Sequence, residues 1–153
     1  MANLPKKGRD LVKGYPGWGP DYYDDGVIHY KSPRKGYWMK AFRKIERVTG
    51  INFEWTRNRN KAEIVCEWDD LIGTGWAGVC RYRRNDHGEP QNLVQVVPNK
   101  WYTRSTVIHE IGHALGLSHP QDHSRTDTIM SYGRAWNLSF FTKLDLAVLD
   151  FLY

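Results

Sequence analysis

The chain has 153 residues, of which 41% are hydrophobic and 25% are charged, and its net charge is +5 at pH 7. This length suits one domain with a sizeable core and is short for two. No stretch approaches the ~18 consecutive apolar residues of a membrane-spanning helix, so we expect no transmembrane segment. The positive charge fits either attraction to an anionic surface or partner, or a solvated basic surface. The basic run at 81–84 carries no recognised nucleic-acid motif, and we predict no sequence-specific nucleic-acid binding.

The first 26 residues are rich in Gly, Pro, Lys and aromatic residues, as in the segment GYPGWGP. We predict an irregular arm here rather than a helix or a strand. The opening sequence MANLPKKGRD lacks the apolar centre of a Sec-type signal peptide, so we expect no Sec-dependent export. Export by another route and residence in a larger assembly both stay open.

The rest of the chain alternates between strand and helix patterns. Short apolar runs predict five strands, at 27–30, 51–55, 62–68, 76–82 and 93–97. Apolar residues at helical spacing predict three helices, at 36–49, about 105–115 and 143–152. Gly50 is a stop signal for the first helix, and Thr142 with Asp145 forms a capping-box start for the last. This order predicts a single α+β domain.

Residues 109–119 read HEIGHALGLSH, which is an HExxHxxGxxH pattern. On a helix, His109 and His113 lie one turn apart on the same face, close enough to share one metal ion. Three neutral imidazoles leave a fourth tetrahedral position open to water, as in catalytic zinc sites. Glu110 lies beside the first ligand, where it can take a proton from that water. Chance would produce the whole pattern in about one of thirty thousand chains of this composition, so we predict a metal-dependent hydrolase.

The third histidine of the pattern requires a bend in the chain. His119 lies six residues after His113, and continued helix would carry it about 9 Å along the axis. Gly116 can end the helix in a left-handed conformation that other residues adopt only at a cost. The chain then turns sharply, and His119 approaches the ion from below.

The extended motif is the signature of the metzincin zinc peptidases, which this chain resembles. That family has a tight turn whose methionine forms an apolar floor beneath the zinc, and Met130 in the segment TIMSY fits it. Tyr132, two residues later, matches the Met-x-Tyr pattern of serralysins and astacins. The residue directly after the third histidine is Pro120, and the resulting sequence SHP resembles that of serralysins. The chain therefore most resembles a minimal serralysin-like catalytic domain, and its 153 residues contain none of the glycine-rich calcium-binding repeats of serralysins.

The resemblance implies a metzincin-like fold. Its expected parts are a mixed twisted sheet with two helices above the cleft, and a small C-terminal subdomain with the Met-turn and the last helix. Within one domain, 1–153, we assign residues 1–26 to the N-terminal arm and residues 27–119 to the upper subdomain with the active-site helix. Residues 120–153 form the lower subdomain.

The resemblance also implies a zinc-dependent endopeptidase that hydrolyses an extended polypeptide. Zinc-activated water would attack the peptide bond, with Glu110 as general base and Tyr132 stabilising the oxyanion. The substrate would pair as an added strand along an upper rim. A pocket beside the zinc would be lined by residues 133–136 and by the last helix. The expected rim and pocket residues are Gly75, Trp76, Ala77, Gly78, Val79, Cys80, Arg81, Arg134 and Trp136.

Two other functions stay open: a structural or binding component of an assembly that retains the site, and a zinc amidase that acts on cell-wall peptides. We predict one catalytic zinc. Calcium is left open, because the acidic loops DYYDD and NDHGEPQN lack the ligand spacing of an EF-hand. His29, His87 and His123 match no metal-site spacing, and we interpret them as surface residues rather than a second site.

Three further residues have two interpretations each. Cys66 and Cys80 form a disulfide if their strands are neighbours, and are otherwise small core residues. Asp10, in the N-terminal arm, is either a ligand that caps the zinc or a plain surface residue, and the second interpretation is the simpler one.

Overall fold

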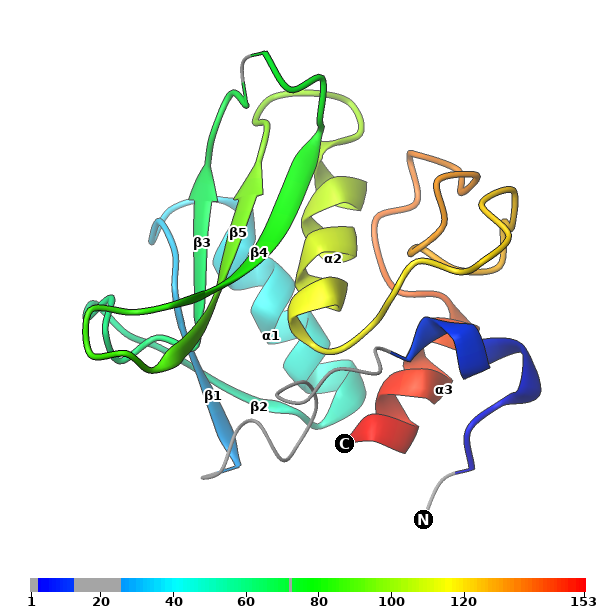
Figure 1. Ribbon diagram of the computed structural model, residues 1–153, viewed down its shortest axis with the longest axis horizontal. Helices are drawn as coiled ribbons and strands as arrows, with labels where there is room; N and C mark the ends of the chain where they lie inside the picture. Colours follow the sequence, from blue (N-terminus) through cyan, green and yellow to red (C-terminus); the bar gives the residue numbers. More distant parts are fainter. Residues whose placement is uncertain (1–2, 13–25, 72) are drawn as a thin grey trace.

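The computed structural model describes residues 3–12, 26–71 and 73–153; the GYPGWGP segment and the DYYDD loop lie outside these ranges. The described part is an α+β domain with a five-stranded sheet, two helices against the sheet, and a smaller region that ends in a third helix (Figure 1). Among the described residues, no helix is long and apolar enough to cross a membrane.

The sheet is mixed, as expected. Its strands are β1 (Val27–Lys31), β2 (Asn52–Trp55), β3 (Ile64–Trp68), β4 (Gly78–Arg84) and β5 (Pro90–Val96). They lie in the order β2-β1-β3-β5-β4, and only β4 runs antiparallel to its neighbour. The central strands β3 and β5 are buried over most of their length, and the buried residues of β5 include the polar side chains of Gln91 and Asn92. Strand β4 is partly exposed and forms one edge of the sheet.

Helix α1 (Tyr37–Thr49) packs on the sheet through one apolar stripe. Trp38, Phe42 and Ile45 recur at helical spacing and are completely or almost completely buried. The helix ends where predicted, because Gly50 adopts a left-handed conformation with φ 76° and its N–H bonds back to the helix.

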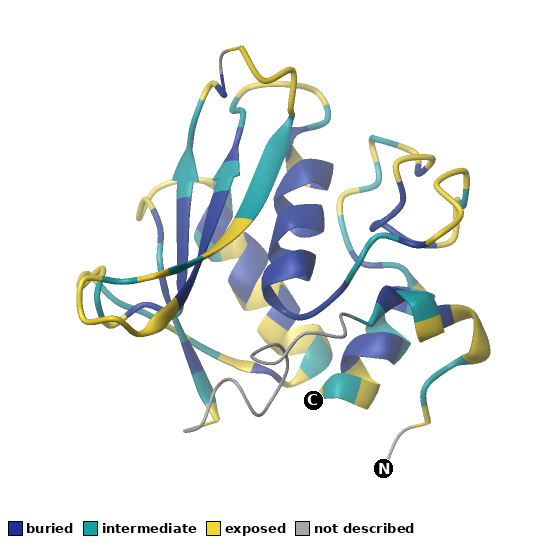
Figure 2. Ribbon diagram, in the orientation of Figure 1, coloured by how far each residue is buried: buried dark blue, intermediate teal, exposed yellow. Residues whose placement is uncertain are grey.

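Helix α2 (Thr103–Ala114) is buried along nearly its whole length, as Figure 2 shows. All residues from Ser105 to Ala114 are buried, including histidines and a glutamate. The helix lies against β4 and β5, and the chain that follows it covers its other side. Polar side chains in such a position need fixed partners, because an unpaired polar group inside a protein is costly.

The N-terminal arm differs from the prediction. It contains a 3-10 helix, η1 (Lys6–Leu11), whose last residue is completely buried, and the next residue, Val12, pairs with Leu117 in an antiparallel bridge. A side chain at Gly8 would collide with Val148, so the arm packs tightly on the last helix. The expectation of an irregular segment was wrong here, since tertiary contacts rather than local propensity fix this turn.

Helix α3 (Lys143–Leu152) begins with the predicted capping box, in which Thr142 and Asp145 exchange hydrogen bonds. The Asp145 carboxylate has a second role besides the cap, at the position where related families place a structural aspartate. It also accepts hydrogen bonds from the Ile129 N–H, at 2.9 Å, and from the Thr128 hydroxyl. One completely buried carboxylate therefore joins the start of α3 to the segment that contains Met130.

We expect Asp145→Asn to lower the free energy of unfolding by about 2–4 kcal/mol, because an amide cannot accept all of these hydrogen bonds and leaves buried donors unpaired. Urea unfolding of the metal-free protein measures the change. The matched control is Asp150→Asn, on the exposed side of the same helix, for which we expect a change within about 0.5 kcal/mol. Equal losses in the two variants would contradict the assigned role.

Candidate metal centre and cleft

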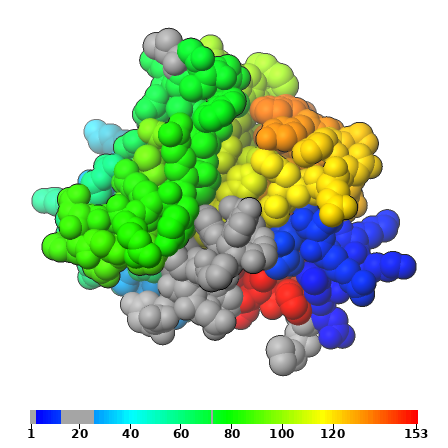
Figure 3. Space-filling model, in the orientation of Figure 1, coloured from blue at the N-terminus to red at the C-terminus, as the bar shows by residue number. Residues whose placement is uncertain are grey.

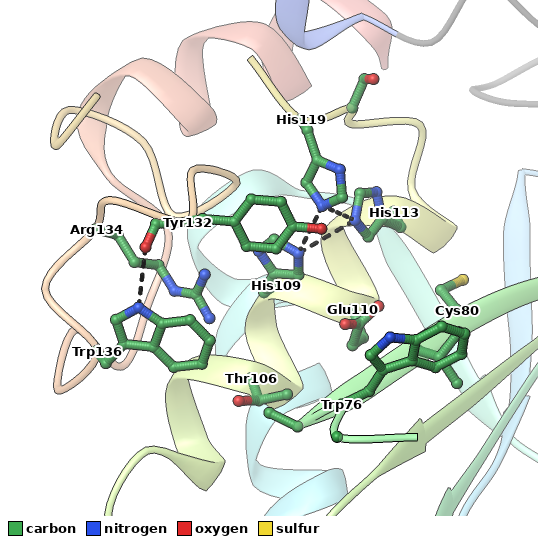
Figure 4. A pocket seen from close by; sticks show the side chains of 15 residues that line it. Trp76, Cys80, Thr106, His109, Glu110, His113, His119, Tyr132, Arg134 and Trp136 are labelled. Atoms are coloured by element: carbon green, nitrogen blue, oxygen red, sulfur yellow. Dashed lines mark hydrogen bonds between the residues drawn. The ribbon is translucent and has the colours of Figure 1, made fainter. Parts of the chain in front are cut away.

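Helix α2 carries the first three residues of the motif. His109 and His113 lie one turn apart and are only 4% and 9% exposed, and Glu110, at 6%, faces the same pocket (Figure 4). The helix backbone thus places two imidazoles and a carboxylate side by side, and close packing leaves these side chains little freedom to move.

The end of α2 turns the chain back toward these residues. Gly116 has φ 104°, the Leu117 N–H donates to the Gly112 carbonyl, and the Gly116 N–H donates to the His113 carbonyl. These two bonds make a Schellman motif, which stops the helix with a left-handed residue. The sequence interpretation of Gly116 agrees with this geometry, and His119 is thereby brought beside the helical pair.

The ring nitrogens of the three histidines meet at one point. The Nε2 atom of His109 lies 3.2 Å from those of His113 and His119, and the latter two are 3.1 Å apart. Ligands about 2.0–2.1 Å from a tetrahedral zinc are separated by about 3.3–3.4 Å, so this set fits the ion. Within the described residues it is the one group of His, Cys, Asp and Glu side chains arranged to hold a metal.

Backbone carbonyls orient two of these rings. The Nδ1 atom of His109 lies 2.8 Å from the Ile129 carbonyl, and that of His113 lies 2.9 Å from the Leu117 carbonyl. A carbonyl only accepts, so each Nδ1 carries the proton and each Nε2 presents its lone pair to the shared point. Such outer hydrogen bonds are the usual support of metal-ligating histidines.

The Met-turn packs directly against α2. Met130 is completely buried, and a Cβ atom added at Gly112 would lie 2.7 Å from its sulfur. Only glycine therefore allows this approach. Because Gly112 lies next to His113 and three residues after His109, the methionine forms an apolar support for the helical ligands.

Tyr132 lies at the mouth of the site. Its side chain is 53% exposed, its ring centroid is 4.7 Å from that of His119, and its hydroxyl points toward the histidine cluster (Figure 4). On the other side its ring lies 5.4 Å from that of His123. Sequence reasoning treated His123 as an ordinary surface residue; it is exposed, but it borders the tyrosine, which no spacing rule indicated.

The three clustered histidines, Glu110 and Tyr132 line one pocket of ≈ 550 Å³. The surface of β4 and the segment before it forms one side, and the segment after α2 forms the other (Figure 3). The lining residues are Gly75, Trp76, Ala77, Gly78, Val79, Cys80, Thr106, His109, Glu110, His113, Ser118, His119, Tyr132, Arg134 and Trp136.

The lining differs from the prediction at four places. Arg81 does not line the pocket, because the lining along β4 ends at Cys80, and its side chain is exposed. No residue of α3 lines the pocket either, since Asp145 ties that helix beneath the Met-turn. Thr106 and Ser118 line it although the sequence did not single them out; neither carries a motif of its own.

Arg134, one of the expected rim and pocket residues, lines the pocket, and only 3% of it is exposed. Its guanidinium donates to the Ser105 hydroxyl at 2.9 Å and to the Ser131 carbonyl at 3.0 Å, and it lies 4.1 Å from the ring centroid of Trp136. Burial lowers the pKa of Arg134 to about 10, although the charge of Glu110 opposes this shift.

A second metal site is not supported in the part of the chain that the structure describes. His29 is largely buried rather than at the surface, and its Nδ1 atom lies 3.0 Å from a carboxylate oxygen of Glu63. His87 is exposed, as expected.

The two cysteines do not form a disulfide. Cys66 and Cys80 both lie opposite Val94, from its two sides, so a whole strand separates them and they are too far apart to bond. Burial raises the pKa of the Cys66 thiol, which behaves as a core residue. Cys80 is half-buried and borders the pocket.

Asp10 does not cap the histidine cluster. Its carboxylate accepts the Gln121 N–H at 2.9 Å and forms a 3.1 Å ion pair with Arg125. It therefore joins the arm to the loop that follows the third histidine.

Comparison with known proteins gives a consistent result. The model of the peptidase family described as Astacin matches residues 22–132, more than half of the chain. A serralysin of Proteus mirabilis is 38% identical over 63 residues, and a serralysin of Photorhabdus luminescens is 32% identical over 91 residues. A metallopeptidase AprA of Pseudomonas marginalis is 38% identical over 63 residues.

These matches cover 41%, 54% and 41% of this chain, and the chain spans only 11%, 19% and 13% of the respective curated relatives. Astacins and serralysins are both metzincin-type zinc metallopeptidases, and this family implies a catalytic zinc and a polypeptide substrate. The chain therefore belongs to the astacin family of peptidases and, with its serralysin relatives, to the metzincin zinc metallopeptidases.

Proposed function

We propose that this chain is a zinc endopeptidase that cleaves extended polypeptide at the centre formed by His109, His113 and His119. One observation carries the proposal: three Nε2 atoms converge within 3.1–3.2 Å of one another beside Glu110, inside a cleft bordered by the edge of a sheet. A zinc ion bound by these nitrogens supplies a Lewis acid and lowers the pKa of water toward ~7.

Glu110 is the proposed general base. It follows the first histidine directly, and its buried position holds the carboxylate at the inner end of the cleft. There it accepts the proton of the attacking water and transfers it to the departing amine. Gly78 supports this position, because a Cβ atom added there would lie 3.1 Å from Cγ of Glu110. The strand thus packs against the side chain itself.

Tyr132 is the proposed donor to the oxyanion. Its hydroxyl faces the histidine cluster, while its exposed ring leaves room to move as substrate enters (Figure 4). A hydroxyl in this position stabilises negative charge that develops on the carbonyl oxygen of the substrate.

Strand β4 is the proposed docking edge for the substrate backbone. It lies at one edge of the described sheet, and a sheet edge is the place where an extended peptide can add as a further strand. Residues 75–80, at and before its start, line the pocket. An extended peptide can pair along this edge and lay one bond across the histidines.

Digestion of a peptide library by the zinc-loaded protein, read by mass spectrometry, tests the activity. We expect cuts that disappear when the metal is chelated and return with added zinc. Stoichiometric zinc without any cleavage would count against the peptidase and favour a structural role for the site.

For Glu110→Gln we expect a loss of about 10³–10⁴-fold in kcat/KM, because the proton acceptor is removed while the shape is kept. Elemental analysis should still find one zinc per chain, since the three ligands are unchanged. A variant that cuts at the wild-type rate would rule out the assigned base.

For Tyr132→Phe we expect a smaller loss, about 10²-fold, carried mainly by kcat, because only one hydrogen bond to the transition state is removed. His123→Gln, beside the same ring but outside the cluster, is the control and should change the rate by less than about threefold. A loss of the same size in both variants would indicate a loop effect instead.

A further inference from the structure

The excess positive charge of the chain is concentrated in one short segment. Of the 22 basic and 17 acidic residues, seven basic residues and one acidic residue fall within positions 31–47. The rest of the chain therefore carries 15 basic and 16 acidic residues and is close to neutral, although the whole chain has a net charge of +5. A concentration of this kind creates a local positive potential that an evenly charged surface lacks.

The charges of this segment form one continuous face on helix α1. Four of its cations recur three and four positions apart, which places them along one side of the helix, opposite the apolar stripe that packs on the sheet. Two more precede the helix. Exposed residues follow the outer side of α1 in Figure 2. We call the six exposed cations the basic face: Arg34, Lys35, Lys40, Arg43, Lys44 and Arg47.

The basic face lacks negative partners. Among residues 3–12, 26–71 and 73–153, no ion pair joins any of its six side chains to a carboxylate. The one acidic residue of α1, Glu46, is tied to strand β2, because its carboxylate accepts the Phe53 N–H at 2.9 Å. Like charges three and four positions apart repel each other, and the first turn of α1 has no acidic residue to offset them. An anionic partner on this face would relieve the repulsion.

Aromatic and apolar side chains lie beside these cations. The Arg34 guanidinium is 4.7 Å from the ring centroid of Trp55, and the Lys44 ammonium is 4.2 Å from that of Phe140. Both rings are half-buried, and Val48, at the end of the same helix, is 46% exposed. Cations mixed with half-buried aromatic rings are typical of protein surfaces at the headgroup level of a membrane.

We propose that the basic face of α1 docks the chain on a bilayer of anionic phospholipids. The apolar stripe of α1 is already used by the core, so the helix contacts headgroups rather than inserting. Each Lys or Arg close to such a surface raises the affinity about fivefold. No residue of 31–47 lines the histidine pocket, so the cleft stays accessible when this face is covered.

Co-sedimentation with large unilamellar vesicles tests this docking. One set of vesicles is phosphatidylcholine alone, and the other contains about 40% phosphatidylglycerol. For the zinc-loaded wild type in ~0.1 M salt, we expect the apparent Kd to be about 100-fold lower for the anionic vesicles. Binding should weaken as the salt concentration rises, because ions screen exposed charges. Equal binding to the two sets, or no binding to the anionic set, overturns the proposal.

Two variants that remove the same charge locate the docking surface. The first carries Lys40→Gln, Arg43→Gln, Lys44→Gln and Arg47→Gln. The control removes four exposed cations outside the basic face, with Arg9→Gln, Arg57→Gln, Lys61→Gln and Arg84→Gln. We expect the first to lose about 100-fold or more in affinity for anionic vesicles, and the control less than about fivefold. Equal losses would show that only net charge matters and would overturn the proposal.

A third variant separates charge from damage to the helix. Arg43→Lys combined with Arg47→Lys keeps both charges and should bind anionic vesicles within about threefold of the wild type, because a bilayer responds to charge rather than to the guanidinium fork. A loss in this variant as large as that of the first would contradict electrostatic docking. Circular dichroism of each variant reports whether the fold is retained.

Duplex DNA of about 30 base pairs is the competing anion, since phosphates dominate its binding to basic surfaces. Anionic vesicles should bind the wild type more tightly than the duplex at equal phosphate concentration. Tighter binding to the duplex, lost in the first variant, would identify nucleic acid as the occupant and overturn the membrane proposal. None of these measurements requires turnover, so the docking surface and the peptidase activity stand or fall separately.

Discussion

The buried carboxylate of Asp145 holds together the two parts of the candidate metal centre. It accepts hydrogen bonds from the start of α3 and from Thr128 and Ile129 in the Met-turn. The carbonyl of Ile129 then accepts the Nδ1 proton of His109, so one chain of bonds runs from the last helix to a metal ligand. These groups lie in the interior, and the loss of one leaves the next without a fixed position.

Helix α2 tolerates ionisable groups in its interior because neighbouring backbone fixes them. The Schellman turn supplies the Leu117 carbonyl for His113, and the Met-turn supplies the carbonyl for His109. Glycines at positions 78 and 112 let β4 and Met130 approach the helix more closely than any side chain would permit. Among the described residues, the centre is thus preorganised by packing against β4, the Met-turn and the Schellman turn, and it faces the cleft.

The sequence predicted those parts whose physics is local. Fixed spacing within 109–119 identified the histidine cluster, and apolar periodicity identified the three α-helices and five strands. It missed features that depend on distant contacts. The arm forms η1 because Gly8 fits against Val148, the cysteines are separated by β5, and α3 lies away from the pocket. The burial of Arg134 arises from Ser105, 29 positions earlier in the chain, which no local pattern indicates.

The contact between the N-terminal arm and the loop before His119 has a thermodynamic consequence. Val12 pairs with Leu117, and the Ser118 N–H donates to the Leu11 carbonyl at 2.7 Å, so the arm is fastened to the residues that deliver the third ligand. Two equilibria that share a structural element are linked, and the coupling is reciprocal. Metal affinity and the resistance of residues 3–12 to proteolysis should therefore rise and fall together, which makes the arm a reporter of whether the centre is loaded.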